Sequence, residues 1–315
     1  MKAVRSTGDL ADKVLVVDVE EPPGSGEVIG VRSASICASD LMYIGFGLTQ
    51  ILGHELAGVR SDGTPVVVEA LFGCGSCTEC KRGRYNLCST VHERALGVRI
   101  DGGMAEHYRA PCERLVPLPP GLDIRDASIV EPASVSWHAL RLAGCGPETR
   151  VAAVGAGALG LLAVAGARRQ GATDVAVDAR HPHQQQAAER LGAVVGPNGL
   201  YDVVVEAAGT EESLARCVDL VAPGGTIVVL GVHTGATVSL PWHTLFMREA
   251  SVVPSLGYCA HDGRPEMVDV ADMLAEDPEI ARAVITHRFP LEDATEAFRV
   301  AADRSSGAIR VVLEP

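Results

Sequence analysis

The stretch Arg150–Asp178, which reads RVAAVGAGALGLLAVAGARRQGATDVAVD, decides the fold of this chain. It begins with an apolar run of strand length and then carries three glycines spaced as G-x-G-x-x-G. The segment Ala158–Gln170 is apolar almost all round and ends before a glycine, and a second apolar run closes on an acidic residue. The order of strand, glycine turn, buried helix, strand and acid predicts a β-α-β unit of a parallel sheet.

The three glycines of this stretch have the spacing of a dinucleotide-binding turn. Gly155 permits a tight turn, Gly157 lets the backbone approach a pyrophosphate, and Gly160 lets the helix pack closely on the strand. The N-terminus of the helix then offers N–H groups and a positive dipole end to the phosphates. Asp178 follows at about the spacing expected for a carboxylate that binds the adenosine ribose. An ordinary β-α-β unit with a glycine-rich turn is the alternative, and the context favours dinucleotide binding.

Length and composition favour a two-domain globular protein. The chain has 315 residues, of which 47% are apolar and 21% charged, which is enough to build packed cores. Its formal net charge of −13 repels phosphate backbones and argues against nucleic acid as a partner. No apolar run approaches the roughly 20 residues of a membrane span. We therefore expect a soluble, cytoplasmic protein that binds neither nucleic acid nor membrane.

A loop with four cysteines gives the most specific metal signal in the sequence. Cys74, Cys77, Cys80 and Cys88 are spaced as C-x2-C-x2-C-x7-C, and four thiolates at this spacing can surround one tetrahedral zinc ion. Disulfides are the alternative, but nothing marks the chain as secreted, and cytosolic thiols stay reduced. The loop therefore predicts a closed structural zinc site that leaves no position for a substrate.

Two further candidate zinc ligands lie earlier in the chain, Cys37 in the segment Ile36–Asp40 and His54 in Gly53-His54-Glu55. Cysteine and histidine are preferred zinc ligands. Taken singly, however, such a cysteine is more often a small buried apolar residue, and such a histidine is more often structural. Their interpretation depends on the other motifs of the chain.

The order of predicted elements divides the chain into three segments. Residues 1–35 alternate short strands with glycine and proline turns, which is typical of an irregular β-barrel. Glu131 begins a helix at the junction to the second segment, with Pro132 in its first turn. The second segment alternates apolar strands with helices and predicts a doubly wound parallel sheet. Within it, Pro223–Gly225 is expected to separate a helix from the strand Thr226–Leu230.

The C-terminal segment returns to a mixed pattern. Glu266–Glu276 is amphipathic and predicts a helix, Leu291–Ala301 predicts a second helix, and Ile309–Leu313 predicts a final strand. We expect this tail to rejoin the first domain, which would then be built from both ends of the chain.

Together these motifs resemble the zinc-containing medium-chain dehydrogenase/reductase (alcohol dehydrogenase) family, especially its polyol (sorbitol-type) and threonine dehydrogenase branch. The resemblance covers essentially the whole chain. The motifs that carry it are Cys37-Ala-Ser-Asp40, Gly53-His-Glu55, the four-cysteine loop, Glu131-Pro-x-Ser-Val-x-x-His138, the Gly155–Gly160 turn with Asp178, Val204-Val-Glu-Ala-Ala-Gly209 and Ile285-Thr-His-Arg-Phe-Pro-Leu291.

The resemblance implies an α/β protein with two domains. One is a GroES-like, irregular β-barrel catalytic domain formed by residues 1–133 and 263–315. The other is a doubly wound, parallel-sheet Rossmann domain that binds NAD, residues 134–262. Members of the family usually form dimers or tetramers through the Rossmann domain, so we expect a homodimer or homotetramer.

The resemblance also implies a catalytic zinc ion, which brings the expected number of zinc ions to two per chain. Cys37, His54 and Glu131 match the ligand positions and would leave one coordination position open, with Glu55 beside the metal and able to bind it in some states. Zinc there would act as a Lewis acid on a substrate hydroxyl. Ser39 would accept the proton and pass it on through the cofactor ribose, and a hydride would move to the nicotinamide.

The expected cofactor is NAD rather than NADP, because the Asp178 carboxylate binds the ribose 2′-hydroxyl and repels a 2′-phosphate. Arg180 lies two residues further on and can partly offset that repulsion. The residues expected to contact the cofactor are Gly155, Ala156, Gly157, Ala158, Leu159, Gly160, Asp178, Arg180, Ala208, Leu230, Gly231 and Val232.

Two departures from the family pattern keep other functions open. Ala38 replaces a glycine, and Met42 stands where many members carry a histidine that ends the proton relay. A methionine carries no proton, so the relay beyond Ser39 is not defined. The function expected is NAD-linked oxidation of a secondary alcohol or polyol. The alternatives are a zinc-free quinone or enone reductase of the same superfamily, or a cofactor-binding homologue without activity.

Overall fold

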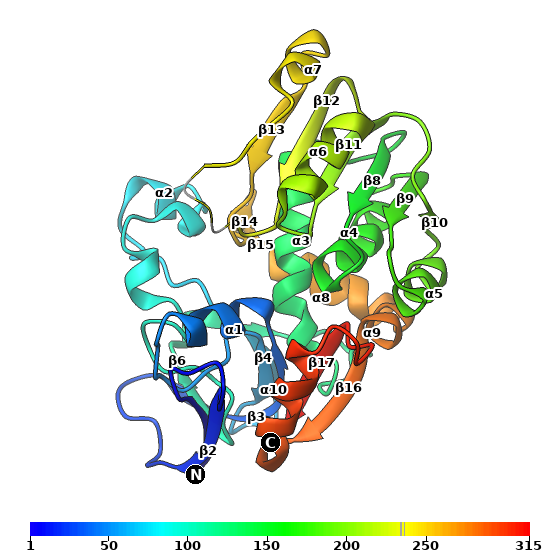
Figure 1. Cartoon of the computed structure of the whole chain (residues 1–315). Helices are drawn as coiled ribbons and strands as arrows, with labels where there is room; N and C mark the ends of the chain where they lie inside the picture. The colour runs from blue at the N-terminus through cyan, green and yellow to red at the C-terminus, as the bar shows by residue number, and fades with distance from the viewer. Residues whose placement is uncertain (234, 236) are drawn as a thin grey trace. The chain divides into compact units, whose positions relative to one another are not determined.

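The computed structural model describes residues 1–233, 235 and 237–315, and these form two compact units (Figure 1). The first unit comprises Met1–Glu131 and Cys259–Pro315, and the second comprises Pro132–Tyr258. The first unit is therefore built from both ends of the chain, whereas the second is one continuous segment. Among the described residues, no helix has the length and apolar character that a membrane span requires.

The first unit is organised around a mixed sheet with the strand order β16-β17-β3-β4-β5-β7, to which β6 adds by pairing with β3. All pairs are antiparallel except β16 with β17. The C-terminal strand β17, red in Figure 1, lies beside the N-terminal β3, with Val312 opposite Ser35. The strands are β3 (Glu27–Ile36), β4 (Leu56–Val59), β5 (Pro65–Val68), β6 (His107–Ala110), β7 (Leu115–Pro117), β16 (Ile285–Pro290) and β17 (Arg310–Glu314).

Short strand pairs and helices complete this unit. β1 (Lys2–Ser6) pairs with β2 (Val14–Asp18), and β14 (Ala260–His261) pairs with β15 (Arg264–Pro265). The α-helices are α1 (Ala38–Gly45), α2 (Thr78–Lys81), α8 (Glu266–Glu276), α9 (Glu279–Val284) and α10 (Ala294–Ala302). The 3-10 turns are η1 (Tyr85–Leu87), η2 (Val91–Arg94), η3 (Cys112–Arg114), η4 (Ala127–Ile129) and η5 (Leu291–Asp293).

The C-terminal helices differ in detail from the sequence prediction. The predicted helix Leu291–Ala301 is divided into η5 and α10, with Asp293 at the N-cap of α10. Helix α9 was not predicted, because its six residues are too few to show a clear helical period. In α10, Ala294, Ala297 and Phe298 are fully buried at positions i, i+3 and i+4, so this face packs in the core of the unit.

The second unit contains a six-stranded parallel sheet with the order β10-β9-β8-β11-β12-β13. Numbered within the unit this order is 3-2-1-4-5-6, which is the Rossmann arrangement, with the switch point between β8 and β11. Ligands bind outside the carboxyl ends of such strands. The strands are β8 (Arg150–Val154), β9 (Asp174–Asp178), β10 (Val194–Val195), β11 (Tyr201–Glu206), β12 (Val221–Val229) and β13 (Ser251–Pro254). The helices are α4 (Ala158–Arg169), α5 (Pro182–Arg190), α6 (Glu211–Leu220) and α7 (Trp242–Met247), and α3 (Val130–Leu142) crosses the division between the units.

One predicted turn of this unit lies inside a strand. β12 begins directly after α6, at Val221, and runs through Pro223–Gly225, which was expected to separate helix from strand. The register against β11 shifts between its residues Tyr201 and Val203, so the proline and glycines form an irregularity within the strand. The prediction that the strand starts at Thr226 was therefore wrong by five residues.

Candidate active site

The first unit brings together a thiol, an imidazole and a carboxylate from two segments. Cys37 is the N-cap of α1 and follows β3, whereas His54 and Glu55 immediately precede β4. β3 and β4 are antiparallel neighbours, and the Ser35 N–H donates to the Glu55 carbonyl oxygen at 2.9 Å, so the two segments lie side by side. One ligand atom from each of Cys37, His54 and Glu55 lies within 4.8 Å of the others.

Asp40 orients this group of side chains. It is fully buried, its Oδ2 accepts from the Cys37 N–H at 2.9 Å, and its Oδ1 lies 3.4 Å from His54 Nδ1. With Nδ1 directed at Asp40, the ring turns Nε2 toward Ser39 Oγ, 3.3 Å away. A carboxylate behind a histidine fixes the ring and strengthens it as a metal ligand.

The electrostatic character of the group favours a cation. Burial lowers the pKa of His54, but the charge of Asp40 and hydrogen bonds to Asp40 and Cys37 outweigh it, and the pKa is raised well above 6.5. The anionic surroundings that hold a proton on the ring also attract a metal ion. Sulfur, imidazole nitrogen and carboxylate oxygen form a donor set that zinc prefers, so the residues present fit that ion.

Glu55 is held by a buried arginine that the sequence did not reveal. Arg310 Nη1, at the start of β17, lies 3.0 Å and 2.9 Å from the two Glu55 oxygens and also donates to the Ile36 carbonyl oxygen at 2.8 Å. The Ser35 hydroxyl donates a short hydrogen bond to Glu55 as well. The Glu55 carboxylate therefore already interacts with the Arg310 guanidinium and the Ser35 hydroxyl.

Glu131 lies in the first turn of α3 and is buried, with 6% of its surface exposed. Glu131 is not part of the group formed by Cys37, His54 and Glu55. Its negative charge nevertheless affects the pKa values of two residues near that group, Tyr43 and Arg310. Burial raises the pKa of Tyr43, and the negative charges of Cys37 and Glu131 raise it further. The positive charge of His54 acts in the opposite direction. The charge of Glu131 also contributes to the raised pKa of Arg310.

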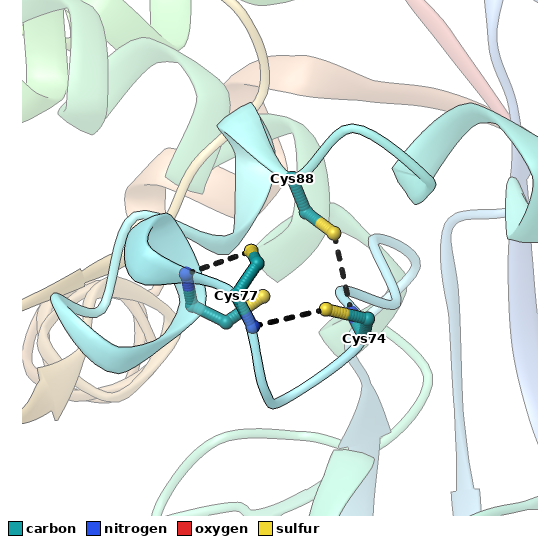
Figure 2. Close-up of side chains that lie close together, drawn as sticks. Cys74, Cys77 and Cys88 are labelled. Carbon is teal, nitrogen blue, oxygen red and sulfur yellow. Dashed lines mark hydrogen bonds between the residues drawn. The ribbon is translucent and has the colours of Figure 1, made fainter.

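The four-cysteine loop places its sulfur atoms in one cluster, with all four Sγ atoms within 4.8 Å of one another. Backbone N–H groups point at the sulfurs: Cys74 N donates to Cys88 Sγ at 3.3 Å, and Cys77 N donates to Cys74 Sγ at 3.3 Å (Figure 2). In α2, Cys77 is the N-cap and accepts from the Cys80 N–H. Such N–H···S contacts favour the thiolate form.

The pKa values of two cysteines in this cluster indicate that a bound cation would stabilise it. Hydrogen bonds from Ser76 and from the Cys77 backbone lower the pKa of Cys74 to about 5. Burial and the neighbouring thiols raise the pKa of Cys80 to about 12. Four crowded thiols resist full ionisation by themselves, and a divalent cation removes that obstacle. The donor set is that of a closed, four-coordinate zinc site.

A buried charged network that was not predicted from the sequence supports the same loop. Tyr85 lies between Cys80 and Cys88 in the sequence. Its hydroxyl donates a short hydrogen bond to Glu69, the residue that follows β5. Arg114 Nη1 lies 3.2 Å from the same carboxylate, and its guanidinium stacks 5.3 Å from the Tyr85 ring. Tyrosine, carboxylate and arginine therefore connect the loop to the sheet.

The second unit shows the geometry of a phosphate-binding turn. Gly155 has a φ of +104°, and a Cβ at Gly160 would lie 1.8 Å from the Gly155 carbonyl oxygen, so both positions require glycine. Gly157 is the N-cap of α4, and a Cβ there would meet nothing within 4 Å. The space beside Gly157, at the N-terminus of α4, is therefore open, and the N–H groups of a helix's first turn are suited to bind a pyrophosphate.

The remaining predicted cofactor residues follow the carboxyl ends of the neighbouring strands. Asp178 ends β9, Ala208 follows β11, and Leu230, Gly231 and Val232 follow β12. Ala156 lies in the turn after β8, and Arg180 is exposed beyond β9.

Glu206, at the end of β11, joins these turns and was not singled out in the sequence. It is fully buried, and its Oε1 accepts from the N–H groups of Ala208 at 2.9 Å and Gly209 at 2.7 Å. Its carbonyl oxygen accepts from the Leu230 N–H at 2.8 Å. A Cβ at Gly231 would lie 2.4 Å from Glu206 Oε2, so the turns after β11 and β12 are packed together around this carboxylate.

Family models match both halves of this architecture. Residues 24–120 match the alcohol dehydrogenase GroES-like domain, and residues 158–276 match the zinc-binding dehydrogenase domain. The chain belongs to the zinc-type medium-chain alcohol dehydrogenase family, in its polyol branch.

Named relatives agree with this assignment over nearly the whole chain. A sorbitol dehydrogenase from Halalkalibacterium halodurans is 28% identical, with 100% of this chain and 99% of the relative covered. The L-galactonate-5-dehydrogenase of Escherichia coli K12 is 28% identical over 88% of both chains. A Sinorhizobium meliloti protein solved with NADP bound superimposes with a TM-score of 0.86 at 28% identity, covering 100% of this chain and 99% of that one.

The protein is thus an oxidoreductase of the zinc-dependent, nicotinamide-linked alcohol dehydrogenase class. The predicted family, fold class and type of enzyme are confirmed, and the relatives do not support the zinc-free reductase alternative.

Proposed function

We propose that this dehydrogenase oxidises a secondary alcohol of the polyol or sugar-acid class, with NAD as the hydride acceptor and a zinc ion held by Cys37, His54 and Glu131. The observation that carries the proposal is the group of Cys37, His54 and Glu55 within 4.8 Å, oriented by Asp40. The named relatives act on sorbitol and L-galactonate, which supports a polyhydroxylated substrate.

Glu131 is proposed as the third ligand because it matches the family's ligand position, whereas Glu55 is the carboxylate with an oxygen within 4.8 Å of the Cys37 and His54 ligand atoms. Glu55 already pairs with the buried Arg310 and accepts from Ser35, and a metal would have to compete with both. Glu131 is buried in the first turn of α3, and its charge acts on Tyr43, which also senses the charges of Cys37 and His54. Glu55 then stays beside the metal and offsets the charge of Arg310.

Bound zinc supplies Lewis-acid polarisation of the substrate oxygen, and bound nicotinamide supplies the hydride acceptor. The protein contributes the proton acceptor and its orientation. Ser39 Oγ lies 3.3 Å from His54 Nε2, on the side of the ring directed away from Asp40, and is the group proposed to take up the hydroxyl proton. Met42, in the same helix α1, has no titratable group and cannot receive the proton from Ser39.

The two units divide the work in this proposal. The first unit, Met1–Glu131 with Cys259–Pro315, carries both metal sites and acts as the catalytic domain. The second unit binds the dinucleotide at the turns after β8, β9, β11 and β12. The predicted cofactor residues that line these turns are Gly155, Ala156, Gly157, Ala158, Leu159, Gly160, Asp178, Arg180, Ala208, Leu230, Gly231 and Val232.

We also propose a homo-oligomer in a reducing compartment. Helix α7 exposes Trp242, Phe246 and Met247 by 67–70%, and β13 has one strand neighbour in the described sheet. An exposed apolar helix and an open strand edge both suit pairing with a second copy. All nine cysteines are free thiols, and the four-cysteine loop needs reduced sulfur to bind zinc.

The test is a substrate screen on purified, zinc-replete protein. We expect NADH to form with at least one member of a panel of hexitols, sugar acids and simple secondary alcohols, and formation to stop when a chelator removes the accessible zinc. A protein that contains two zinc ions, binds NAD and oxidises no member of the panel would contradict the proposal.

A further inference from the structure

Asp178, the residue on which the expectation of NAD depends, is paired with an arginine. Arg216, on α6, places its Nε 2.8 Å from Asp178 Oδ2, and its Nη2 lies 3.4 Å from the Pro197 carbonyl oxygen. The two side chains are 39% and 37% exposed, so the pair lies at the surface and a ligand can reach it. Asp178 also remains in the binding turn, because the Gly155 N–H points at its carbonyl oxygen at 3.3 Å.

The pairing changes what this carboxylate can do. An isolated carboxylate at the end of this strand accepts hydrogen bonds from the ribose hydroxyls and repels a 2′-phosphate. A guanidinium at hydrogen-bond distance compensates the negative charge, and Oδ2 already accepts from it. Arginine also presents planar N–H donors that match phosphate oxygens. The basis for excluding a 2′-phosphate is therefore weakened on this protein.

A second cation lies near the same helix. Backbone and Thr210 hydrogen bonds lower the pKa of Glu212, and the positive charge of Arg180 contributes to the same shift. Glu212 and Arg216 are one helical turn apart on α6 and share a face. Two carboxylates, Asp178 and Glu212, are thus accompanied by two guanidinium groups, that of Arg216 in contact with Asp178 and that of Arg180 acting on Glu212.

We propose that Arg216 is a specificity-determining residue that lets the adenosine ribose site accept a 2′-phosphate, so that the protein binds both NAD and NADP. The inference rests on the proposed cofactor site and deepens it. With NAD, Asp178 Oδ1 stays available to a ribose hydroxyl. With NADP, the guanidinium supplies charge and N–H donors to the phosphate beside the carboxylate.

The test compares the Kd of NAD and of NADP, measured by calorimetry on the purified full chain and its variants. For the parent protein we expect the two Kd values to agree within roughly tenfold. Arg216→Leu should raise the Kd of NADP by roughly 10- to 100-fold, the worth of a hydrogen bond to a charged group, and leave that of NAD within about twofold. Arg190→Leu, which removes the same charge from the last turn of α5, should leave both values unchanged.

Arg216→Lys and Arg216→Gln keep the inference testable if the leucine variant does not fold. Lysine retains the charge without the planar fork and should weaken NADP by less than glutamine does. An Arg216 variant that melts like the parent and keeps the parent ratio of the two Kd values would overturn the inference while leaving the NAD site intact. Loss of both dinucleotides from the parent protein would instead refute the cofactor site itself.

Discussion

The two metal-ligand groups of the first unit are built in opposite ways. The four-cysteine group takes all its donors from one loop, Cys74–Cys88, and backbone N–H groups of that loop point at its sulfurs. The group around Cys37 and His54 takes its donors from separate segments, one that follows β3 and one that precedes β4. Behind the donors lie the buried Asp40, which is in the helix that Cys37 caps, and the buried Arg310 from the distant strand β17.

The difference separates a closed site from an open one. Four sulfurs satisfy a tetrahedral ion completely, so the loop can stabilise structure but has no position for a substrate. Cysteine, histidine and one carboxylate leave a position open, and the side chains behind them fix orientation and charge. Changes to the first group should therefore affect stability, whereas changes to the second should affect the reaction.

The largest effect is expected from Cys37→Ala. Loss of the thiolate removes the proposed catalytic zinc ion, and a Lewis acid is worth several kcal/mol of barrier, so kcat/KM should fall by at least about 10³-fold. The zinc content should drop from two to one while the melting temperature changes little. Cys112→Ala, at an exposed free thiol in the same unit, is the matched control. Parent-like turnover of the Cys37 variant would show that this group does not carry the chemistry.

Cys80→Ser tests the other side of the comparison. The remaining three thiols no longer close the site, and zinc lost from the loop should cost on the order of 5 kcal/mol of unfolding free energy. That cost corresponds to a fall of roughly 10–20 °C in Tm, measured by calorimetry. Enzyme still folded at low temperature should keep its kcat. A variant with normal Tm and one zinc ion fewer would mean that the loop does not depend on its metal.

Arg310→Met probes the charge balance behind the second group. Removing the guanidinium leaves Glu55 buried without its cation, which should destabilise the protein by about 3 kcal/mol in urea unfolding. Arg125→Met breaks an exposed ion pair with Glu314 and should cost less than about 1 kcal/mol. Equal costs for the two variants would contradict the importance given to burial of the Glu55–Arg310 pair.

Tyr85→Phe removes a hydrogen bond from the network below the four-cysteine loop. The Glu69 carboxylate loses one donor in a buried position, so the free energy of unfolding should fall by about 1–2 kcal/mol. Tyr108→Phe, at a second buried tyrosine of the same unit, should cost less because its hydroxyl bonds no carboxylate among the described residues. An equal fall in unfolding free energy for both variants would show that the effect comes from packing and not from the hydrogen bond to Glu69.

Glu69 gives the smallest expected effect and a pH dependence of definite sign. Burial raises its pKa above the ordinary 4.5, against the opposing bonds from Tyr85 and Arg114. The folded state therefore binds the proton more tightly than the unfolded state, and this contribution to stability is lost as pH rises through the raised pKa. Relative to Glu69→Gln, the parent should lose stability as pH rises from the ordinary pKa of 4.5 to the raised pKa, by about 1.4 kcal/mol for each unit between the two. A parent that gains stability over this range would contradict the sign.

The sequence predicted the parts of both sites that are local. The glycine turn Gly155–Gly160 and the four-cysteine loop each lie within a short stretch, and their spacing follows from the chemistry of phosphate and zinc. Cys37 and His54 could be predicted as zinc ligands only together with the other motifs of the family. The stretch Arg150–Asp178 was likewise predicted from local patterns, and it forms β8, α4 and β9 in the predicted order.

The parts that the sequence could not predict are contacts between distant segments. Arg310 and Glu55 are 255 residues apart, and an arginine at the start of a C-terminal strand carries no sign of that partner. Arg216 meets Asp178 because α6 packs against β8 and β11, which lets its side chain reach the end of the neighbouring strand β9. Glu206 is part of a motif that carries the family resemblance. Its contacts with the turns after β11 and β12, however, depend on the parallel pairing of these two strands.

Anomalous diffraction at the zinc absorption edge, from crystals of zinc-replete protein, tests the central claim most directly. The account predicts two zinc peaks per chain, one surrounded by Cys74, Cys77, Cys80 and Cys88 and the other within bonding distance of Cys37, His54 and Glu131. A catalytically active crystal with zinc in the loop and none at Cys37 and His54 would contradict it.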